Sequence, residues 1–263
     1  MRSTAALLVL LLGAGTVHAE KDYQPWYKGE RGKKRILHIS ISAAVGLVWL
    51  ASQTVAKDAL SPDTCRWCTA PSIDRSARNA VVWNNTDRAG LYSTIDAYIV
   101  APVIGLTLLA ISDRDASWGR LLDDTIPVAE TVAISQLLTQ AIKFSVGRRR
   151  PYKEFGDQSK PYTTEENLSF TSGHASLGFA ITASAGIICH WRHYWTEPYV
   201  WGTGIALSVT TEYLRMAADK HYLTDVVAGG LVGLGSGLLI PRLMRQDIKI
   251  APIPGGAAVV GMF

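Results

Sequence analysis

Residues 221–241 read HYLTDVVAGGLVGLGSGLLIP, an apolar run with one charged residue, Asp225. Its glycine and alanine content suits close contact between helices better than pairing of strands, so we predict a helix here. If His221 and Asp225 share that helix, their i, i+4 spacing places both side chains on one face, where the carboxylate can accept the imidazole N–H. A purely structural His/Asp pair is the alternative interpretation of this spacing.

Apolar runs of similar length recur toward the N-terminus. Residues 36–56 contain no Asp, Glu, Lys or Arg and can span a membrane, which takes ~20 helical residues. The other predicted helices cover residues 91–112, 126–144, 172–191 and 198–215. We therefore predict an all-α fold, a bundle of about six helices embedded in a membrane. A soluble helical domain is the alternative, because Asp96, Glu130 and Glu212 interrupt the runs with carboxylates.

The segments outside these helices differ from them in composition. Residues 1–19 resemble a secretory signal peptide that ends at an Ala-x-Ala-type site, with an uncleaved anchor as the alternative. Residues 20–35 are expected to form a basic linker and residues 246–263 a short extended tail, which leaves residues 36–245 as the helical domain. The net charge of +4 is only mildly basic, and no nucleic-acid partner is expected.

A polar loop is predicted over residues 57–88, and it contains Cys65 and Cys68. Export would place both thiols in an oxidising compartment, where they can close a small disulfide loop. Two free thiols are the alternative. The sequence offers no second cysteine pair or nearby histidine, so no zinc site is expected.

Three polar clusters lie near the ends of predicted helices. In the first, six residues separate Lys143 from Arg150, and Pro151 takes the backbone out of the helix, so two cations can converge on one point. Arginine presents a planar fork that matches two phosphate oxygens, and lysine adds a compact charge. A basic cluster after an apolar helix is also a common topology determinant, so this pattern alone is a weak signal.

The second cluster is Ser172-Gly173-His174, at the start of a predicted helix. Ser172 is a favourable N-cap, and the free backbone N–H groups of Gly173 and His174 can bind an anion at the positive end of the helix dipole. The third cluster consists of Arg215 and the His/Asp pair described above, with five residues between Arg215 and His221. Three cations, two histidines and a carboxylate in this order are hard to attribute to coincidence.

Together the clusters resemble the signature of the type 2 phosphatidic acid phosphatase and vanadium haloperoxidase superfamily. That signature reads Lys-x6-Arg-Pro, then Pro-Ser-Gly-His, then Ser-Arg-x5-His-x3-Asp, and residues 221–229 are similar to the family beyond the catalytic letters. The resemblance covers roughly the second half of the chain. Two letters depart from it. Thr171 stands where the family usually has Pro, and Leu214 stands where it usually has Ser, which removes a possible hydroxyl bond to the phosphate.

The resemblance implies a phosphatase that needs neither a metal nor a cofactor. His221, oriented by Asp225, would attack phosphorus and form a phosphohistidine. His174 would protonate the leaving oxygen and then activate water. The residues implied to hold the phosphoryl oxygens are Lys143, Arg150, Ser172, Gly173 and Arg215.

The expected substrate is a lipid phosphate or diphosphate in a bacterial cell envelope, with the site in the inner membrane and facing the periplasm. A soluble periplasmic phosphatase that acts on small esters is the first alternative. A haloperoxidase would bind vanadate as a cofactor in the same site, with His221 as its ligand. A non-catalytic protein that binds lipid phosphate is the last alternative, and it would need no nucleophile.

Overall fold

The structure is a computed structural model that describes residues 31–112, 118–156, 163–245, 249–253 and 256–260. The predicted signal peptide or anchor, residues 1–19, lies outside the described residues, as does most of the predicted linker.

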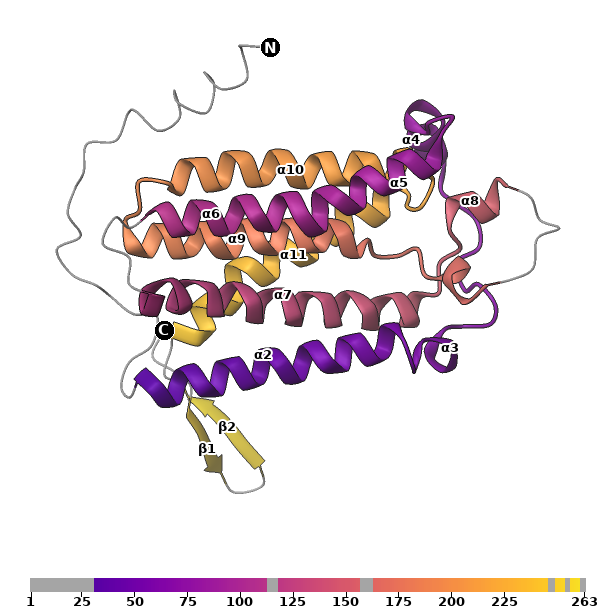
Figure 1. Ribbon diagram of the computed structural model, residues 1–263. Helices are drawn as coiled ribbons and strands as arrows, with labels where there is room; N and C mark the ends of the chain where they lie inside the picture. The colour runs from indigo at the N-terminus through magenta and orange to yellow at the C-terminus, as the bar shows by residue number, and fades with distance from the viewer. Residues whose placement is uncertain (1–30, 113–117, 157–162, 246–248, 254–255, 261–263) are drawn as a thin grey trace, which may run out of the picture.

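Six long helical elements lie side by side in a bundle, which confirms the predicted all-α fold (Figure 1). One of the six is continuous through a π-helical turn. They are α2 (Arg31–Gln53), the run of α5 (Thr86–Ile95), η1 (Asp96–Val100) and α6 (Ala101–Ser112), α7 (Trp118–Val146), α9 (Gly173–Arg192), α10 (Glu197–Ala217) and α11 (Leu223–Arg245).

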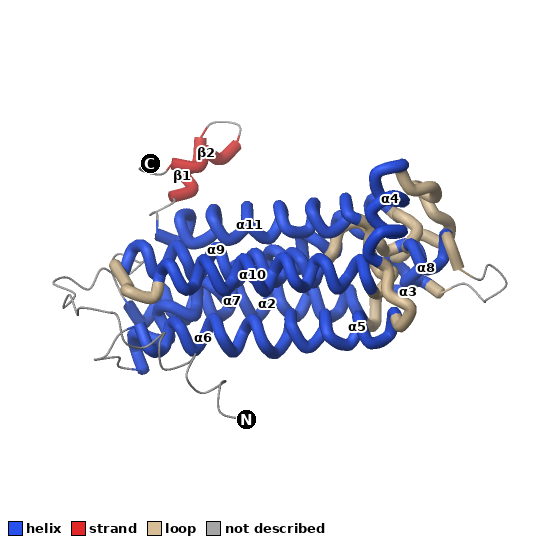
Figure 2. The backbone as a smooth tube through the Cα atoms, turned by 90° about the horizontal axis from the view of Figure 1, so that it is seen from above, coloured by secondary structure: helices blue, strands red, loops and turns tan. Residues whose placement is uncertain are grey.

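The shorter elements lie at the two ends of the bundle (Figures 1 and 2). At one end are α3 (Lys57–Leu60), α4 (Ser72–Val81), α8 (Pro151–Glu154) and η2 (Thr164–Asn167). At the other end the tail forms an antiparallel pair of strands, β1 (Lys249–Ile253) and β2 (Gly256–Val260), in which Lys249 lies opposite Val260.

Helix α9 forms the centre of the bundle, with 14 of its 20 residues buried. It packs most closely against α11, where glycines replace side chains at the contact. A Cβ atom on Gly229 would lie 2.3 Å from the carbonyl oxygen of Ser172, and one on Gly233 would lie 2.2 Å from that of Ser176. The glycine content of residues 221–241 therefore serves close helix packing, as predicted.

The outer faces of the bundle are apolar. Three segments are long and apolar enough to cross a membrane, namely residues 32–53, 86–112 and 223–245. Exposed large side chains on these and neighbouring helices include Leu47, Ile99, Leu138, Val209 and Leu231. So much exposed apolar surface is unfavourable in water and suits lipid, and the bundle is that of a membrane protein.

Polar side chains within the bundle face other helices. Asp96 accepts a hydrogen bond from Thr211 at 2.7 Å, which joins η1 to α10. Helix α2 lies along α7 and is tied to it by polar pairs. These pairs are Arg35 with Asp123 at 2.5 Å, His38 with Glu130 at 2.7 Å, and Gln53 with Gln140 at 2.8 Å. Two of the three interrupting carboxylates therefore meet a partner inside the protein, as membrane burial requires.

Several predicted boundaries are wrong. Helix α7 begins at Trp118, eight residues before the predicted start, because Asp123 and Asp124 are buried with partners and do not interrupt it. Asp124 accepts hydrogen bonds from Arg192 at 2.7 Å and Tyr194 at 2.6 Å. Helix α2 begins at Arg31, so the last five residues assigned to the basic linker are helical.

The predicted polar loop, residues 57–88, is also more ordered than expected. It contains α3 and α4 and the first turn of α5, which Asn85 caps by accepting from the backbone N–H of Arg88 at 3.0 Å. Asp74 anchors α4, because its buried carboxylate accepts from the backbone N–H of Thr224 at 2.9 Å. This long-range contact stabilises a helix that has too few apolar residues to be recognised from its sequence.

The structure joins Cys65 and Cys68 by a disulfide, with their Cα atoms 5.3 Å apart. We predict that the exported protein carries this bond, since the loop lies at the end of the bundle away from the start of α2 (Figure 1). Alkylation of the purified protein without reductant, followed by mass spectrometry, should leave both cysteines unmodified. Two alkylated thiols would show that this end of the bundle faces a reducing compartment.

Candidate active site

All three sequence clusters meet at one end of the bundle. The C-terminal ends of α7 and α10 and the N-terminal ends of α9 and α11 lie together there, beside α4 and α8 (Figure 1). Antiparallel neighbours bring these ends together although Lys143 and Asp225 are far apart in sequence. The end that holds the site also holds the Cys65–Cys68 loop (Figure 1).

Lys143 and Arg150 approach the site from opposite sides of a sharp turn. Helix α7 ends at Val146, and Gly147 adopts a left-handed conformation, φ +59°, that suits glycine. Lys143 is buried, and a Cβ on Gly173 would lie 3.8 Å from its Nζ atom, so the ammonium group lies at the start of α9.

Arg150 is held in place from the loop side of the site. Its Nε donates to the carbonyl oxygen of Glu165 at 2.9 Å, and its Nη2 lies 3.2 Å from the Glu165 carboxylate, which Lys57 also contacts. Burial opposes ionisation of Glu165, but Arg150 and Lys57 outweigh it and hold the pKa of the carboxyl at about 2. The carboxylate therefore stays ionised and balances part of the positive charge.

The start of α9 provides backbone donors, as predicted. Ser172 is the N-cap, and its hydroxyl accepts from the backbone N–H of Ala175 at 3.4 Å. Its own N–H donates to the carbonyl of Asp225 at 3.0 Å, which fixes the start of α9 against α11. Gln136 donates to the carbonyl of Gly173 at 3.1 Å. The first turn of α9 is therefore held rigidly next to Lys143.

Arg215 supplies the third cation from the last turn of α10. Its side chain is 7% exposed, and its Nη1 donates to the Ser93 hydroxyl at 3.3 Å. Its Nε is buried and has no hydrogen-bond partner among the described residues. A buried guanidinium N–H without a partner is costly, which favours a bound anion at this position.

The position of His221 corrects one prediction. His221 and Asp225 do not share a helix, because α10 ends at Ala217, Asp219 has a φ of +57°, and α11 begins only at Leu223. The His221 Nδ1 atom lies 2.8 Å from the Ser169 carbonyl oxygen and 3.7 Å from the Asp225 carboxylate. The direct hydrogen bond partner of the imidazole is thus a backbone carbonyl.

This contact fixes the tautomer of His221. A carbonyl oxygen only accepts hydrogen bonds, so Nδ1 carries the proton and Nε2 carries the lone pair. Burial, followed by the positive charges of Arg150, Arg215 and Lys143, holds the pKa of His221 well below its usual value, although the bond to Ser169 opposes the shift. The imidazole is therefore neutral at neutral pH and has a free Nε2, as a nucleophile requires.

His174 occupies the first turn of α9, next to this group. Its ring and the ring of Tyr98 from η1 form a T-shaped pair, with centroids 4.9 Å apart. Its Nε2 is buried without a hydrogen-bond partner among the described residues. A second imidazole nitrogen is thus available at the site. The π-helical turn that carries Tyr98 is of the kind often found at functional sites.

The PAP2 superfamily matches residues 124–249, which contain all three clusters. This region is a PAP2 superfamily domain. Phospholipid phosphatase 2 of Mus musculus is 28% identical to the chain, over 46% of this chain and 52% of its own length. The Bos taurus protein of the same name is also 28% identical, over 46% and 50%. The chain spans about half the length of the curated relatives it matches.

Among solved structures, the chain is similar to a transmembrane PAP2 type phosphatidylglycerolphosphate phosphatase from Bacillus subtilis. The TM-score is 0.46 and the identity 16%, over 80% of this chain and 93% of that chain.

Next to the site of this PAP2 domain lies a buried arginine, Arg148, whose sequence pattern predicts no role for it. Arg148 is 1% exposed. Its guanidinium donates to Asp225 at 2.5 Å, to Thr224 at 2.7 Å and to Asp74 at 2.6 Å. Its Cζ atom lies over the rings of Trp67 and Tyr222, 3.8 Å and 4.2 Å from their centroids.

Through Trp67, Asp74 and Asp225, Arg148 joins the disulfide loop and α4 to the end of the bundle that holds the candidate site. Asp225, its partner, also accepts from the Ser169 hydroxyl at 2.5 Å and from the Tyr222 N–H at 2.9 Å. Ser169 in turn positions His221 through its carbonyl. Asp225 therefore orients the imidazole through Ser169 and not directly.

Sequence spacing gave no signal for several of these residues. Asp74, Tyr98 and Ser169 are isolated polar residues in their own segments, and contacts with distant residues give them their roles. Arg148 lies within the first cluster, but its guanidinium contacts Asp74, Thr224 and Asp225. A buried arginine flanked by two carboxylates becomes visible only when the fold brings α4 and α11 together.

The two departures from the family signature have different surroundings. Leu214 is buried in α10 and offers no hydroxyl. Thr171 is 1% exposed, and its hydroxyl has no hydrogen-bond partner among the described residues. Thr171 thus has a spare buried donor beside Ser172, where the family usually has a proline.

Proposed function

We propose that this protein is a membrane phosphatase that hydrolyses a lipid phosphate through a phosphohistidine on His221. The observation that carries the proposal is the geometry of His221, a neutral imidazole whose Nδ1 is bound to a backbone carbonyl and whose Nε2 is free. The cations that surround it would stabilise the charge of the phosphoryl group as it is transferred.

In the first step, the lone pair of His221 Nε2 attacks phosphorus, and the bond from phosphorus to the lipid oxygen breaks. The cations Lys143, Arg150 and Arg215 hold the equatorial oxygens together with the N–H groups at the start of α9. His174 gives its proton to the leaving oxygen. A bound phosphate favours the protonated form of His174 because its negative charge lies next to the ring.

In the second step, His174 takes a proton from water, whose oxygen attacks the phosphohistidine. The P–N bond breaks, the electron pair returns to His221 Nε2, and inorganic phosphate leaves. Asp225 stabilises the positive imidazole of the intermediate from 3.7 Å. None of these steps requires a metal ion, because the three fixed cations supply the positive charge.

The location of the site supports a periplasmic reaction. The Cys65–Cys68 disulfide lies at the same end of the bundle as the site, and disulfides persist in oxidising compartments. We place this end in the periplasm of a bacterial inner membrane, with the basic start of α2 in the cytoplasm, an orientation that agrees with the alternative of an uncleaved N-terminal anchor. The matching relatives named phospholipid phosphatase 2 support a phospholipid as substrate.

The test is release of inorganic phosphate from phosphatidic acid by the full-length protein in detergent with excess EDTA. We expect release to continue in EDTA and to be inhibited by vanadate, whose trigonal bipyramid resembles the transition state. No release from phosphatidic acid, a polyprenyl diphosphate or p-nitrophenyl phosphate would refute the proposed function. Activity that EDTA abolishes and a divalent ion restores would refute the metal-independent mechanism. Bromide oxidation by the vanadate-loaded protein would favour the haloperoxidase alternative.

A further inference from the structure

A long apolar groove runs along the bundle from the active site. Its volume is about 510 Å³, and residues of α2, η1, α6, α7 and α9 line it. Of the sixteen lining residues, only Trp49, Tyr98, Thr125 and Gln136 have polar side-chain atoms. Leu106, on its wall, is 49% exposed, so the groove reaches the lipid-facing surface of the bundle.

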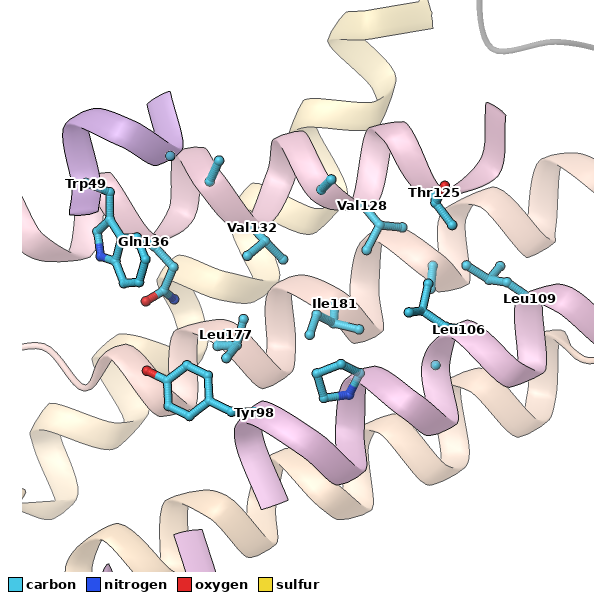
Figure 3. A pocket seen from close by; sticks show the side chains of 16 residues that line it. Trp49, Tyr98, Leu106, Leu109, Thr125, Val128, Val132, Gln136, Leu177 and Ile181 are labelled. Carbon is cyan, nitrogen blue, oxygen red and sulfur yellow. The ribbon is translucent and has the colours of Figure 1, made fainter. Parts of the chain in front are cut away.

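One end of the groove touches the catalytic residues. Tyr98 packs against the ring of His174, and Gln136 donates to the backbone of Gly173. Figure 3 shows Trp49, Gln136 and Tyr98 together at this end, and Leu109 and Thr125 at the other. Three of the four polar residues of the groove therefore lie next to the phosphate site, and the remainder of the groove is apolar except for Thr125 at its far end.

We propose that this groove holds one acyl chain of the lipid whose phosphate lies at His221. This inference rests on the proposed function and specifies where an acyl chain of the lipid binds. The occupant is an alkyl chain because the walls are apolar and the groove continues directly into the active site. The Nε1 of Trp49 is buried without a partner among the described residues, and it can donate to an ester oxygen near the head of the chain.

The length of the groove sets a limit on the chain that it can hold. From Gln136 to Thr125, eleven residues along α7, the groove extends about 16 Å at 1.5 Å per helical residue. An extended alkyl chain advances about 1.25 Å per carbon, given carbon–carbon bonds of about 1.5 Å, so the groove takes about thirteen carbons. The end of a longer chain would lie outside it.

Gly105 is the residue that keeps the middle of the groove open. It lies on α6 opposite Ile181 of α9, and a Cβ atom there would lie 3.3 Å from Ile181 Cγ2. Leucine at this position would place its branched side chain across the groove. Gly202 on α10 is the matched control, because it is exposed and a Cβ there meets no atom within 4 Å.

The first measurement is photocrosslinking with phosphatidic acid that carries a diazirine near the tenth carbon of one acyl chain. The full-length wild-type protein in detergent should be labelled on α6 and α7, within residues 102–109 or 125–133, and excess unlabelled phosphatidic acid should suppress this labelling. In Gly105→Leu this labelling should fall at least about tenfold, and in Gly202→Leu it should stay at the wild-type level. Labelling that stays on the outer faces of α10 and α11, or that Gly105→Leu does not change, would overturn the proposal.

The second measurement compares two substrates. The ratio of kcat/KM for dipalmitoyl phosphatidic acid to that for p-nitrophenyl phosphate should fall at least about tenfold in Gly105→Leu and stay within about twofold in Gly202→Leu. An unchanged ratio in Gly105→Leu would overturn the groove as the chain site while leaving the phosphatase intact. Crosslinking does not depend on turnover, so it tests whether the groove binds the acyl chain even if no phosphatase activity is found.

Discussion

Replacing His221 by alanine is expected to lower turnover of every phosphate ester by at least about 10⁴-fold, because no phosphohistidine can then form. The loss should be the same for p-nitrophenyl phosphate and for phosphatidic acid, since both need the nucleophile. Thermal unfolding in detergent serves as the control for folding. Correctly folded His221→Ala that retains turnover would contradict the assignment of the nucleophile.

The companion variant, His174→Ala, should behave differently from His221→Ala. Loss of the general acid should cost about 10²–10⁴-fold for phosphatidic acid, whose alkoxide leaving group needs a proton. In the first step with p-nitrophenyl phosphate the cost should be less than about tenfold, because nitrophenolate leaves without help. Equal losses in the first step for both substrates would show that His174 is not the acid.

The second large effect is expected at Arg148, which contacts no substrate in the proposed mechanism. Arg148→Met leaves the buried carboxylates of Asp74 and Asp225 without their shared counter-charge. Breaking a buried ion pair in this way costs about 3–5 kcal/mol of stability. The same change releases Asp225 and, through it, Ser169 and His221, so we expect kcat to fall at least about 100-fold.

Arg149→Met provides a matched control for Arg148→Met. Arg149 is the neighbouring arginine, it is half-buried, and no side-chain hydrogen bond or ion pair is seen for it among the described residues. We expect Arg149→Met to have a free energy of unfolding within about 0.5 kcal/mol of the wild-type value and a kcat within about twofold of it. In Arg148→Met, KM should change less than kcat, because the phosphate-binding cations remain in place. Equal effects of the two substitutions would refute the positioning role.

Arg148→Lys distinguishes charge from shape at the same position. Lysine keeps the positive charge but cannot bridge two carboxylates or stack between Trp67 and Tyr222. We therefore expect stability to recover in part and kcat to stay low. Full recovery of kcat would mean that charge alone is needed at Arg148.

The sequence predicted the bundle, and the residues of its three clusters lie together in the structure, because helix ends and helix lengths depend on local signals. Ser172 marks the start of α9 as an N-cap, and the three clusters lie at helix ends that short connections bring together. The same reasoning failed for α7, where Asp123 and Asp124 look like an interruption. Their partners, Arg35 and Arg192, are distant in the sequence, so a local pattern cannot show that these charges are satisfied inside the protein.

The geometry around His221 was predicted in part. Its proposed role comes from the family resemblance, but the i, i+4 interpretation assumed a helix where the backbone turns at Asp219. The true partner is a backbone carbonyl, and any residue type at position 169 could provide one. Side-chain patterns carry no information about such a contact, which explains why Ser169 was missed.

Direct isolation of the phosphoenzyme is the measurement that tests the central claim most closely. His174→Ala should form the phosphohistidine from p-nitrophenyl phosphate but hydrolyse it slowly, because the base for the second step is missing. After an alkaline quench, which preserves the P–N bond, mass spectrometry should find one phosphoryl group, on His221, and none in the His174→Ala/His221→Ala double variant. A phosphoryl group on another residue, or none on His221 while nitrophenol is released, would contradict the mechanism.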